Sequence, residues 1–240
     1  MLADIKPDQK KDLLARLNEQ QIEAVCHEWG PALVVAGAGS GKTTVLTRRI
    51  AYLDQELNQD TGNILAVTFT NKAAGEMKTR VELILGKEKV RSLTIGTFHS
   101  ICARILRQEI ESYKTEEGFE WTSNFVIYDE VDSLNVMKGV VKSLNLDEKV
   151  FNPKEIKNKI SSLKNEGYTC QLYSSNARTY RENRISEIFN RYQRELAKNN
   201  ALDFDDLLLV FVDLLKKNNT VRERLRRRYR HVLVDEFQDT

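Results

Sequence analysis

Residues 36–44, AGAGSGKTT, combine three glycines with a lysine and two threonines in a pattern suited to phosphate binding. Glycines let successive backbone N–H groups turn toward one anion, and the lysine ammonium reaches further along a chain of phosphates. The pattern G-x-x-x-x-G-K-[ST] is matched at Gly41, Lys42 and Thr43, with Ala36 in its first position. A turn that only joins a strand to a helix is the weaker interpretation. We expect the phosphate-binding residues to be Ala36, Gly37, Ala38, Gly39, Ser40, Gly41, Lys42, Thr43 and Thr44.

Two adjacent carboxylates, Asp235 and Glu236, follow a short apolar run near the other end of the chain. In phosphate-loop sites Mg²⁺ is held by the Ser or Thr of the loop, here Thr43, and by an acid at the end of a neighbouring strand. The second acid can orient and deprotonate water in line with the γ-phosphate. An acidic pair alone often only caps a helix. Together with the loop it predicts a nucleoside triphosphatase site, with Lys42, Asp235 and Glu236 as its catalytic residues.

The elements that must position these residues follow from the apolar pattern. Continuous Val/Ile/Leu runs are typical of parallel strands that are buried on both faces. Helical spacing separates them, which predicts right-handed βαβ units and an α/β fold. The predicted strands are 31–36, 63–70, 92–98 and 231–236.

The middle of the chain departs from this alternation and predicts an inserted helical subdomain. One helical stripe follows Asp129, a predicted N-cap, and another ends at Asn199 and Asn200, while 125–128 is the only strand-like interruption. The predicted division is 1–110 for the first part of the nucleotide-binding domain, 111–202 for the insertion and 203–240 for the continued domain.

Composition restricts the class of protein. The 240 residues are 41% hydrophobic, and 37 Lys and Arg against 35 Asp and Glu leave a formal net charge of +2, so only a local basic groove could bind nucleic acid. Three dispersed cysteines predict neither a disulfide framework nor a zinc cluster. No apolar stretch approaches the roughly 20 residues of a membrane span, and no signal-peptide core is present. We expect no membrane partner and a cytoplasmic location.

Five motifs, taken in order, resemble those of the UvrD/PcrA/Rep-type superfamily 1 DNA helicases: AGAGSGKT, ILAVTFTNKAA, TFHS, LDFDDLL and DEFQDT. The stretch LNEQQIEAV is similar to the adenine-contacting Q motif of that family. The resemblance implies a truncated P-loop NTPase domain of RecA-like type, with an inserted helical subdomain and a final Walker B motif. It further implies ATP and Mg²⁺ as cofactors, single-stranded DNA and single/double-strand junctions as partners, and 3′ to 5′ movement.

The resemblance also implies roles for individual residues. Gln21 would bind adenine, and Gln238 would couple the nucleotide state to DNA. Aromatic faces stack on bases without sequence preference, and the residues matching DNA-contacting positions are Phe69, Asn71, Thr97, Phe98 and His99. Two alternatives stay open: Phe69 as a core residue at a strand end, and His99 as a helix-start residue bonded to backbone.

Two features depart from the family pattern. Many relatives place an arginine near the base where this chain has Thr44, so adenine would depend more on Gln21. The family's second RecA-like domain, with its arginine fingers, has no counterpart here, so we expect an N-terminal fragment with little or no helicase activity by itself. A non-motor ATP-binding module that regulates assembly and a small P-loop kinase are the alternatives, and TFTNKAA and TFHS favour the motor.

Two charged segments have simpler interpretations than ligand binding. The six arginines of 222–230 predict the solvated face of a helix. In LDFDDLL, Asp203 is expected to cap the following helix, while Asp205 and Asp206 face water or connect the insertion to the core.

Overall fold

The computed structural model describes residues 13–37 and 39–239, and contacts divide the chain into two compact units. The first, here called the α/β unit, comprises residues 1–98 and 223–240, and the second, the helical unit, comprises 99–222. Contacts therefore group 99–110 and 203–222 with the helical unit, whereas the sequence suggested borders at 110/111 and 202/203. The functional domain boundaries remain a prediction.

The sheet of the α/β unit contains three parallel strands in the order β2-β1-β5 within the described residues. Leu65 of β1 is paired with Thr94 on one side and with Val232 on the other. The strands are β1 (Ile64–Thr68), β2 (Thr94–Thr97) and β5 (His231–Val234). Three of the four predicted strands are thus confirmed, and with them the α/β fold with a parallel sheet.

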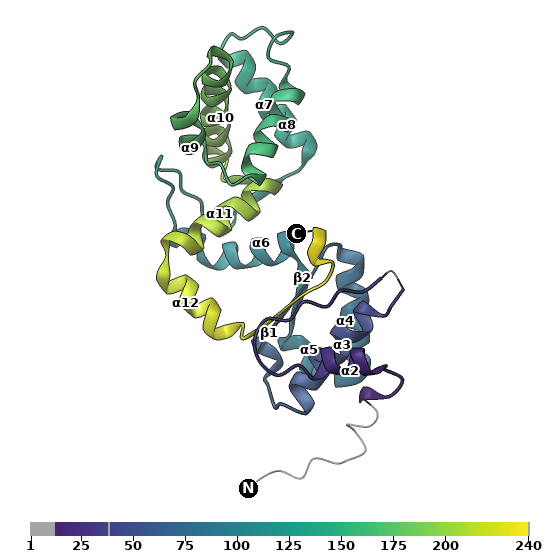
Figure 1. Ribbon diagram of the computed structural model, residues 1–240. Helices are drawn as coiled ribbons and strands as arrows, with labels where there is room; N and C mark the ends of the chain where they lie inside the picture. The colour runs from purple at the N-terminus through teal and green to yellow at the C-terminus, as the bar shows by residue number, and fades with distance from the viewer. Residues whose placement is uncertain (1–12, 38, 240) are drawn as a thin grey trace. The chain divides into compact units, whose positions relative to one another are not determined.

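Helices of the α/β unit gather beside this sheet (Figure 1). They bury one apolar cluster that includes Ile50, Ile64 and Met77, and a second that includes Val25 and Tyr52. The segments are α2 (Glu19–Cys26), α3 (Lys42–Gln55), η1 (Thr61–Asn63), α4 (Asn71–Leu85), α5 (Lys87–Ser92) and η3 (Phe237–Asp239).

The predicted strand at 31–36 is wrong, because this segment forms no ladder with any described strand. Its apolar side chains are exposed, with Val35 at 88% of its full accessibility. An apolar run sets only the tendency to extend, and a strand also needs a neighbour for its N–H and C=O groups.

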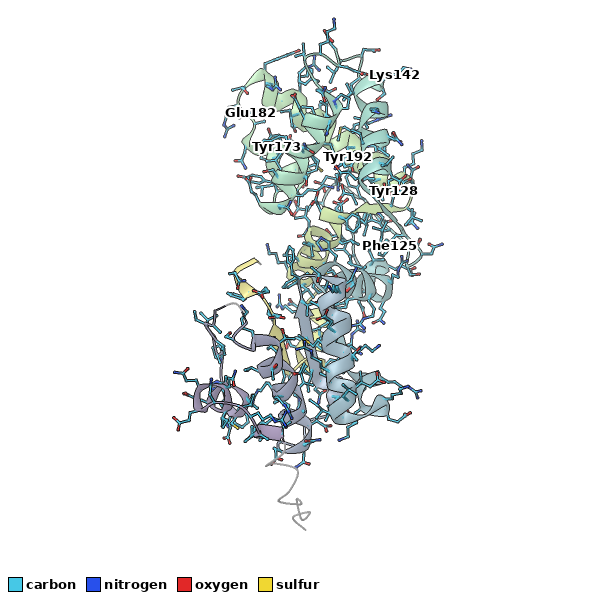
Figure 2. All side chains as sticks on the ribbon, turned by 90° about the vertical axis from the view of Figure 1, so that its right-hand side faces the viewer. Phe125, Tyr128, Lys142, Tyr173, Glu182 and Tyr192 are labelled. Carbon is cyan, nitrogen blue, oxygen red and sulfur yellow. The ribbon has the colours of Figure 1, made fainter. Side chains whose placement is uncertain are left out.

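The helical unit packs its helices around one apolar core. Figure 2 shows Tyr173 and Tyr192 among these helices, whereas Lys142 lies on the outside. The helices are α6 (Phe98–Glu109), η2 (Ile110–Ser112), α7 (Glu130–Ser143), α8 (Pro153–Asn165), α9 (Cys170–Asn176), α10 (Tyr180–Lys198) and α11 (Phe204–Lys217). The last helix, α12 (Asn219–Arg228), begins in this unit, and its residues from Glu223 on belong to the α/β unit. In the part of the chain that the structure describes, no helix is long and apolar enough to cross a membrane.

Local capping explains where these helices begin. Asp129 caps α7 through a reciprocal capping box and Asp203 caps α11 in the same way, as predicted. The exposed arginines at the end of α12 are also as expected. Asp206 does not face water, because its side chain is fully buried. It is bonded to Lys164 of α8, which agrees with the other expectation, a connection between the insertion and the core.

The helical unit also contains a two-stranded parallel sheet, of which the sequence predicted one strand, at 125–128, and missed the other. It pairs β3 (Val126–Tyr128) with β4 (Ala201–Asp203). The indole Nε1 of Trp121 donates a hydrogen bond to Ala201 O at 2.9 Å, and both residues are buried. Trp121 therefore ties the start of the insertion to β4.

We expect Trp121→Phe to lower the free energy of unfolding of the helical unit by about 2 kcal/mol, because a buried carbonyl loses its donor. Urea titration followed by far-ultraviolet circular dichroism measures this effect. The matched control is Trp29→Phe, since Trp29 is 87% exposed, and its effect should stay within about 0.5 kcal/mol. Equal effects of the two substitutions would contradict the proposed anchoring.

Candidate functional site

The glycine-rich loop leads directly into α3. Gly41 takes the N-cap position with a left-handed φ of 88°, and Gly39 also has a positive φ of 74°. Ser40 Oγ donates to Gly37 O at 2.7 Å, which closes the turn. Ala38, also predicted to bind phosphate, lies outside the described residues. The loop therefore presents its backbone at a helix N-terminus, where the helix dipole favours an anion.

Gln21 joins this loop to the start of α2. Its Oε1 accepts from Asn18 N and its own N–H donates to Asn18 Oδ1, which forms a capping box. Its Nε2 donates to Ser40 O at 2.9 Å. Because an amide NH₂ has two hydrogens and its oxygen has two lone pairs, one donor and one acceptor remain for a ligand. The side chain predicted to bind adenine is thus held against the phosphate loop.

Lys42 is the side chain that links the loop to the acidic pair. Its Nζ lies 3.4 Å from Ala36 O and 3.6 Å from Glu236 Oε1. Thr43 and Thr44 follow it in the first turn of α3. The sheet thus brings together the phosphate loop and the acids that the sequence assigned to one site.

Asp235 and Glu236 stand where β5 ends. Asp235 N donates to Val67 O at 2.9 Å, which extends the β1–β5 ladder by one bond. Burial of the Asp235 carboxyl raises its pKa, the Glu236 carboxylate acts in the same direction, and Lys42 opposes both. A carboxylate that is costly to ionise here would be stabilised by a bound cation.

Glu236 has a backbone conformation that is rare for a side-chain-bearing residue. Its φ is 51°, in the left-handed region, and its N–H donates to Asp235 Oδ1 at 3.1 Å. Gln238 Nε2 donates to Glu236 Oε2. Such strain is found where a side chain must be aimed, and here it aims the carboxylate at Lys42.

The residues expected to contact DNA follow the neighbouring strands. Phe69 and Asn71 come directly after β1, and Thr97 and Phe98 stand at the end of β2. Carboxyl ends of parallel strands lie at one edge of a sheet, so these residues share the edge with Asp235. Phe69 is 62% exposed, so the alternative of a core residue is wrong.

His99 lies in the helical unit, where its ring packs edge-on against Phe204 with centroids 5.8 Å apart. Burial lowers the pKa of His99, and Asp205 opposes this effect. Phe204 itself is 51% exposed and was missed from the sequence. It precedes Leu207 by three residues, a spacing that predicts a buried helix face, so nothing in the pattern distinguished it.

The donor set at this edge fits a magnesium ion. Mg²⁺ in phosphate sites takes one or two carboxylates together with substrate oxygens and water. Asp235 supplies a buried carboxylate whose pKa is raised by burial although Lys42 opposes the rise, and Thr43 supplies a hydroxyl at the start of α3. These are the residues that would hold the ion.

A glycine-rich loop at a helix start, next to acids that follow a parallel strand, defines the class of P-loop α/β proteins. The family model for the UvrD/REP helicase N-terminal domain matches residues 17–240. The chain therefore belongs to the UvrD/REP helicase family, which confirms the resemblance of its motifs.

Curated relatives carry the names of whole helicases. The chain is 47% identical over 228 residues to "ATP-dependent DNA helicase PcrA" of Bacillus subtilis (strain 168), covering 95% of this chain. It is 45% identical over 241 residues to "ATP-dependent DNA helicase UvrD1" of Mycobacterium leprae (strain TN), covering 99% of this chain. It spans 30% of the length of either relative.

We expect Gly41→Ala to destabilise the loop by roughly 1–2 kcal/mol, because a side chain raises the energy of a left-handed residue. The new Cβ would also lie 3.1 Å from Gln21 Nε2 and push against its bond to Ser40. The free energy of unfolding from urea titration reports the change. Gly37→Ala is the matched control, since its Cβ meets nothing within 4 Å and its φ is not positive. A cost as large for Gly37→Ala would refute the role given to the left-handed turn.

Proposed function

We propose that this chain is the N-terminal ATP-binding part of an ATP-dependent DNA helicase or translocase that moves 3′ to 5′. The observation that carries the proposal is the 3.6 Å separation of Lys42 Nζ and Glu236 Oε1, which joins the phosphate loop to the acidic strand end. The printed names of the relatives support the same activity. Such a protein would act on DNA in the cytoplasm, with a second RecA-like domain as its partner.

In this proposal the phosphates of ATP replace Glu236 as the ion-pair partner of Lys42. The ammonium binds β- and γ-phosphate oxygens together with the N–H groups of the loop, and Glu236 then becomes available to accept a proton from water. Asp235 and Thr43 would hold Mg²⁺, which would neutralise charge on the phosphates. Gln238 donates to Glu236, so it can sense whether that carboxylate is engaged.

Single-stranded DNA is the proposed second ligand, at the strand ends that carry Phe69, Asn71, Thr97 and Phe98. An exposed aromatic contributes roughly 1–3 kcal/mol by stacking on a base of any sequence. Phe69 has that exposure in the α/β unit, and Phe204 has it in the helical unit beside His99. Binding at single/double-strand junctions is part of the same proposal.

The nucleotide site is tested by two substitutions with opposite signatures. Lys42→Ala should weaken Mg-ATP binding by about tenfold or more, because a charged hydrogen bond to phosphate is lost. Glu236→Gln should keep or tighten binding, since it releases the ammonium, while slowing hydrolysis by ~10²–10⁴-fold in the full-length parent. Titration with a fluorescent ATP analogue and single-turnover hydrolysis separate the two effects. Lys78→Ala, an exposed lysine on α4, is the control and should change neither. Normal hydrolysis by Glu236→Gln would remove Glu236 from the role of base.

The DNA site is tested by fluorescence anisotropy of a labelled oligonucleotide across a salt series. We expect Phe69→Ala to weaken binding by about 1–3 kcal/mol at every salt concentration, because stacking is lost. The slope of log affinity against log salt should not change, since it counts phosphate contacts. Leu83→Ala removes an apolar side chain of comparable exposure on α4 and serves as the control. If the unaltered chain bound no single strand even at low salt, the non-motor ATP-binding module would be favoured.

A further inference from the structure

A cluster of three charged side chains lies inside the helical unit, away from its surface. Lys164 of α8, Asp203 at the end of β4 and Asp206 of α11 are all buried, and Asp206 has no exposed surface. Lys164 Nζ lies 2.7 Å from Asp203 Oδ2 and 2.8 Å from Asp206 Oδ1. One ammonium is thus shared by two carboxyl groups.

The remaining partners of this cluster carry no positive charge. Tyr192 OH donates to Asp203 Oδ2 at 2.9 Å, and Gln193 Nε2 donates to Asp206 Oδ1 at 3.0 Å. In the capping box, Asp206 N donates to Asp203 Oδ1 at 2.8 Å and Asp203 N donates to Asp206 Oδ2 at 3.4 Å. If both carboxyl groups were ionised, the buried cluster would hold one uncompensated negative charge. Two carboxylates that share a buried site do not both ionise readily.

The surroundings of Asp206 add no cation that could balance this charge. Asp206 and Gln193 line a cavity of about 70 Å³ within the helical unit. Lys217 at the same cavity already pairs with Asp213 at 2.8 Å. The other titratable groups that face Asp206 or this cavity are acids, phenols and one thiol, and none of them supplies a positive charge: Tyr113, Glu116, Glu117, Cys170, Asp213 and Tyr192.

Gln193 supplies an independent observation. Its Oε1 is the only side-chain nitrogen or oxygen that is buried without a hydrogen-bond partner in the described parts of the chain. Buried acceptors are almost always satisfied, so an orphan needs a physical reason. The amide oxygen and NH₂ exchange places by a half-turn about the last side-chain torsion. That turn would bring Oε1 to Asp206, where it can accept a hydrogen bond only if Asp206 carries a proton.

We propose that Asp206 is a proton-binding site that holds a proton from solvent near neutral pH and donates it to Oε1 of the turned Gln193 amide. Lys164 then keeps one full carboxylate partner, Asp203, and the cluster becomes neutral. When the proton returns to solvent, the amide turns back and donates to the Asp206 carboxylate.

The electrostatics of the cluster agree with this assignment. Burial and the neighbouring Asp203 carboxylate raise the pKa of Asp206 to about 7. Burial also opposes ionisation of Asp203, but Lys164 outweighs it and the pKa of Asp203 is lowered. The proton therefore belongs to Asp206. Because the folded-state pKa lies above the unfolded value of 3.8, proton binding favours the folded state, and this stability is lost as the pH rises through about 7.

The 240-residue chain tests the proposal directly. Infrared difference spectra between pH 6 and pH 8 should contain the C=O stretch of a protonated carboxylic acid. Asp206→Asn should abolish this signal, and Asp205→Asn should keep it. Asp205 is the matched control, since it lies one residue earlier on α11 and its side chain accepts a hydrogen bond from Asn165 Nδ2 at 3.4 Å, outside the Lys164 cluster.

Stability provides the second measurement. Lowering the pH from 8 to 6 should reduce the unfolding equilibrium constant of the helical unit by about tenfold through Asp206. Asp206→Asn should lose this factor relative to Asp205→Asn, and comparing the two variants cancels the titration of the three histidines.

Three results would overturn the proposal. The first is the absence of a carboxylic acid signal in the unaltered chain, which requires no variant to fold. The second is a signal that persists in Asp206→Asn and disappears in Asp203→Asn. The third is an equal pH dependence of stability in the Asp206 and Asp205 variants.

Discussion

The pairing of β5 with β1 is the interaction on which the candidate nucleotide site depends. Parallel strands end at the same edge of a sheet, so this ladder carries the last residues of the chain to the level at which β1 ends. The bond from Asp235 N to Val67 O continues the ladder and fixes the acidic pair. Only then can Glu236 lie within 3.6 Å of Lys42. The helical unit separates these partners in sequence without separating them in space.

Local patterns predicted the elements that depend on local physics. The strands at 64–68, 94–97 and 231–234 and the caps Asp129 and Asp203 all follow from apolar runs and capping chemistry. Long-range pairing was less predictable. Residues 31–36 have the composition of a strand and no described neighbour, whereas Ala201–Asp203 forms a strand because β3 and Trp121 supply its hydrogen bonds. Strand identity therefore depended on partners that the segment itself does not reveal.

In the candidate site, too, features set by the local sequence were predicted and features set by distant partners were not. The order Gly41, Lys42, Thr43 predicted a loop, and the left-handed φ of Gly41 shows why glycine stands there. The sequence did not predict that Gln21 would bond to Ser40, that Glu236 would be left-handed, or that Phe204 would be exposed. The burial of charged side chains was the least predictable feature, because acidic side chains are normally exposed to solvent. Asp206 was expected to face water or to connect the insertion to the core, and the sequence did not predict that its partner Lys164 would be buried.

Each unit contains a buried carboxyl group whose negative charge must be compensated, and the two units compensate it differently. Asp206 is enclosed, so its charge is balanced by the buried Lys164 and, in our proposal, by a proton taken up from solvent. Asp235 stands at the open edge of a sheet, where Lys42 is shared with Glu236 and only opposes the rise in its pKa. A charge left partly uncompensated at an accessible edge can be stabilised by an arriving cation, whereas an enclosed one cannot. The free-energy cost of burying the Asp235 carboxylate is only partly offset, as expected for a position that binds an ion. At Asp206 the corresponding cost is offset within the unit, as expected for a structural position.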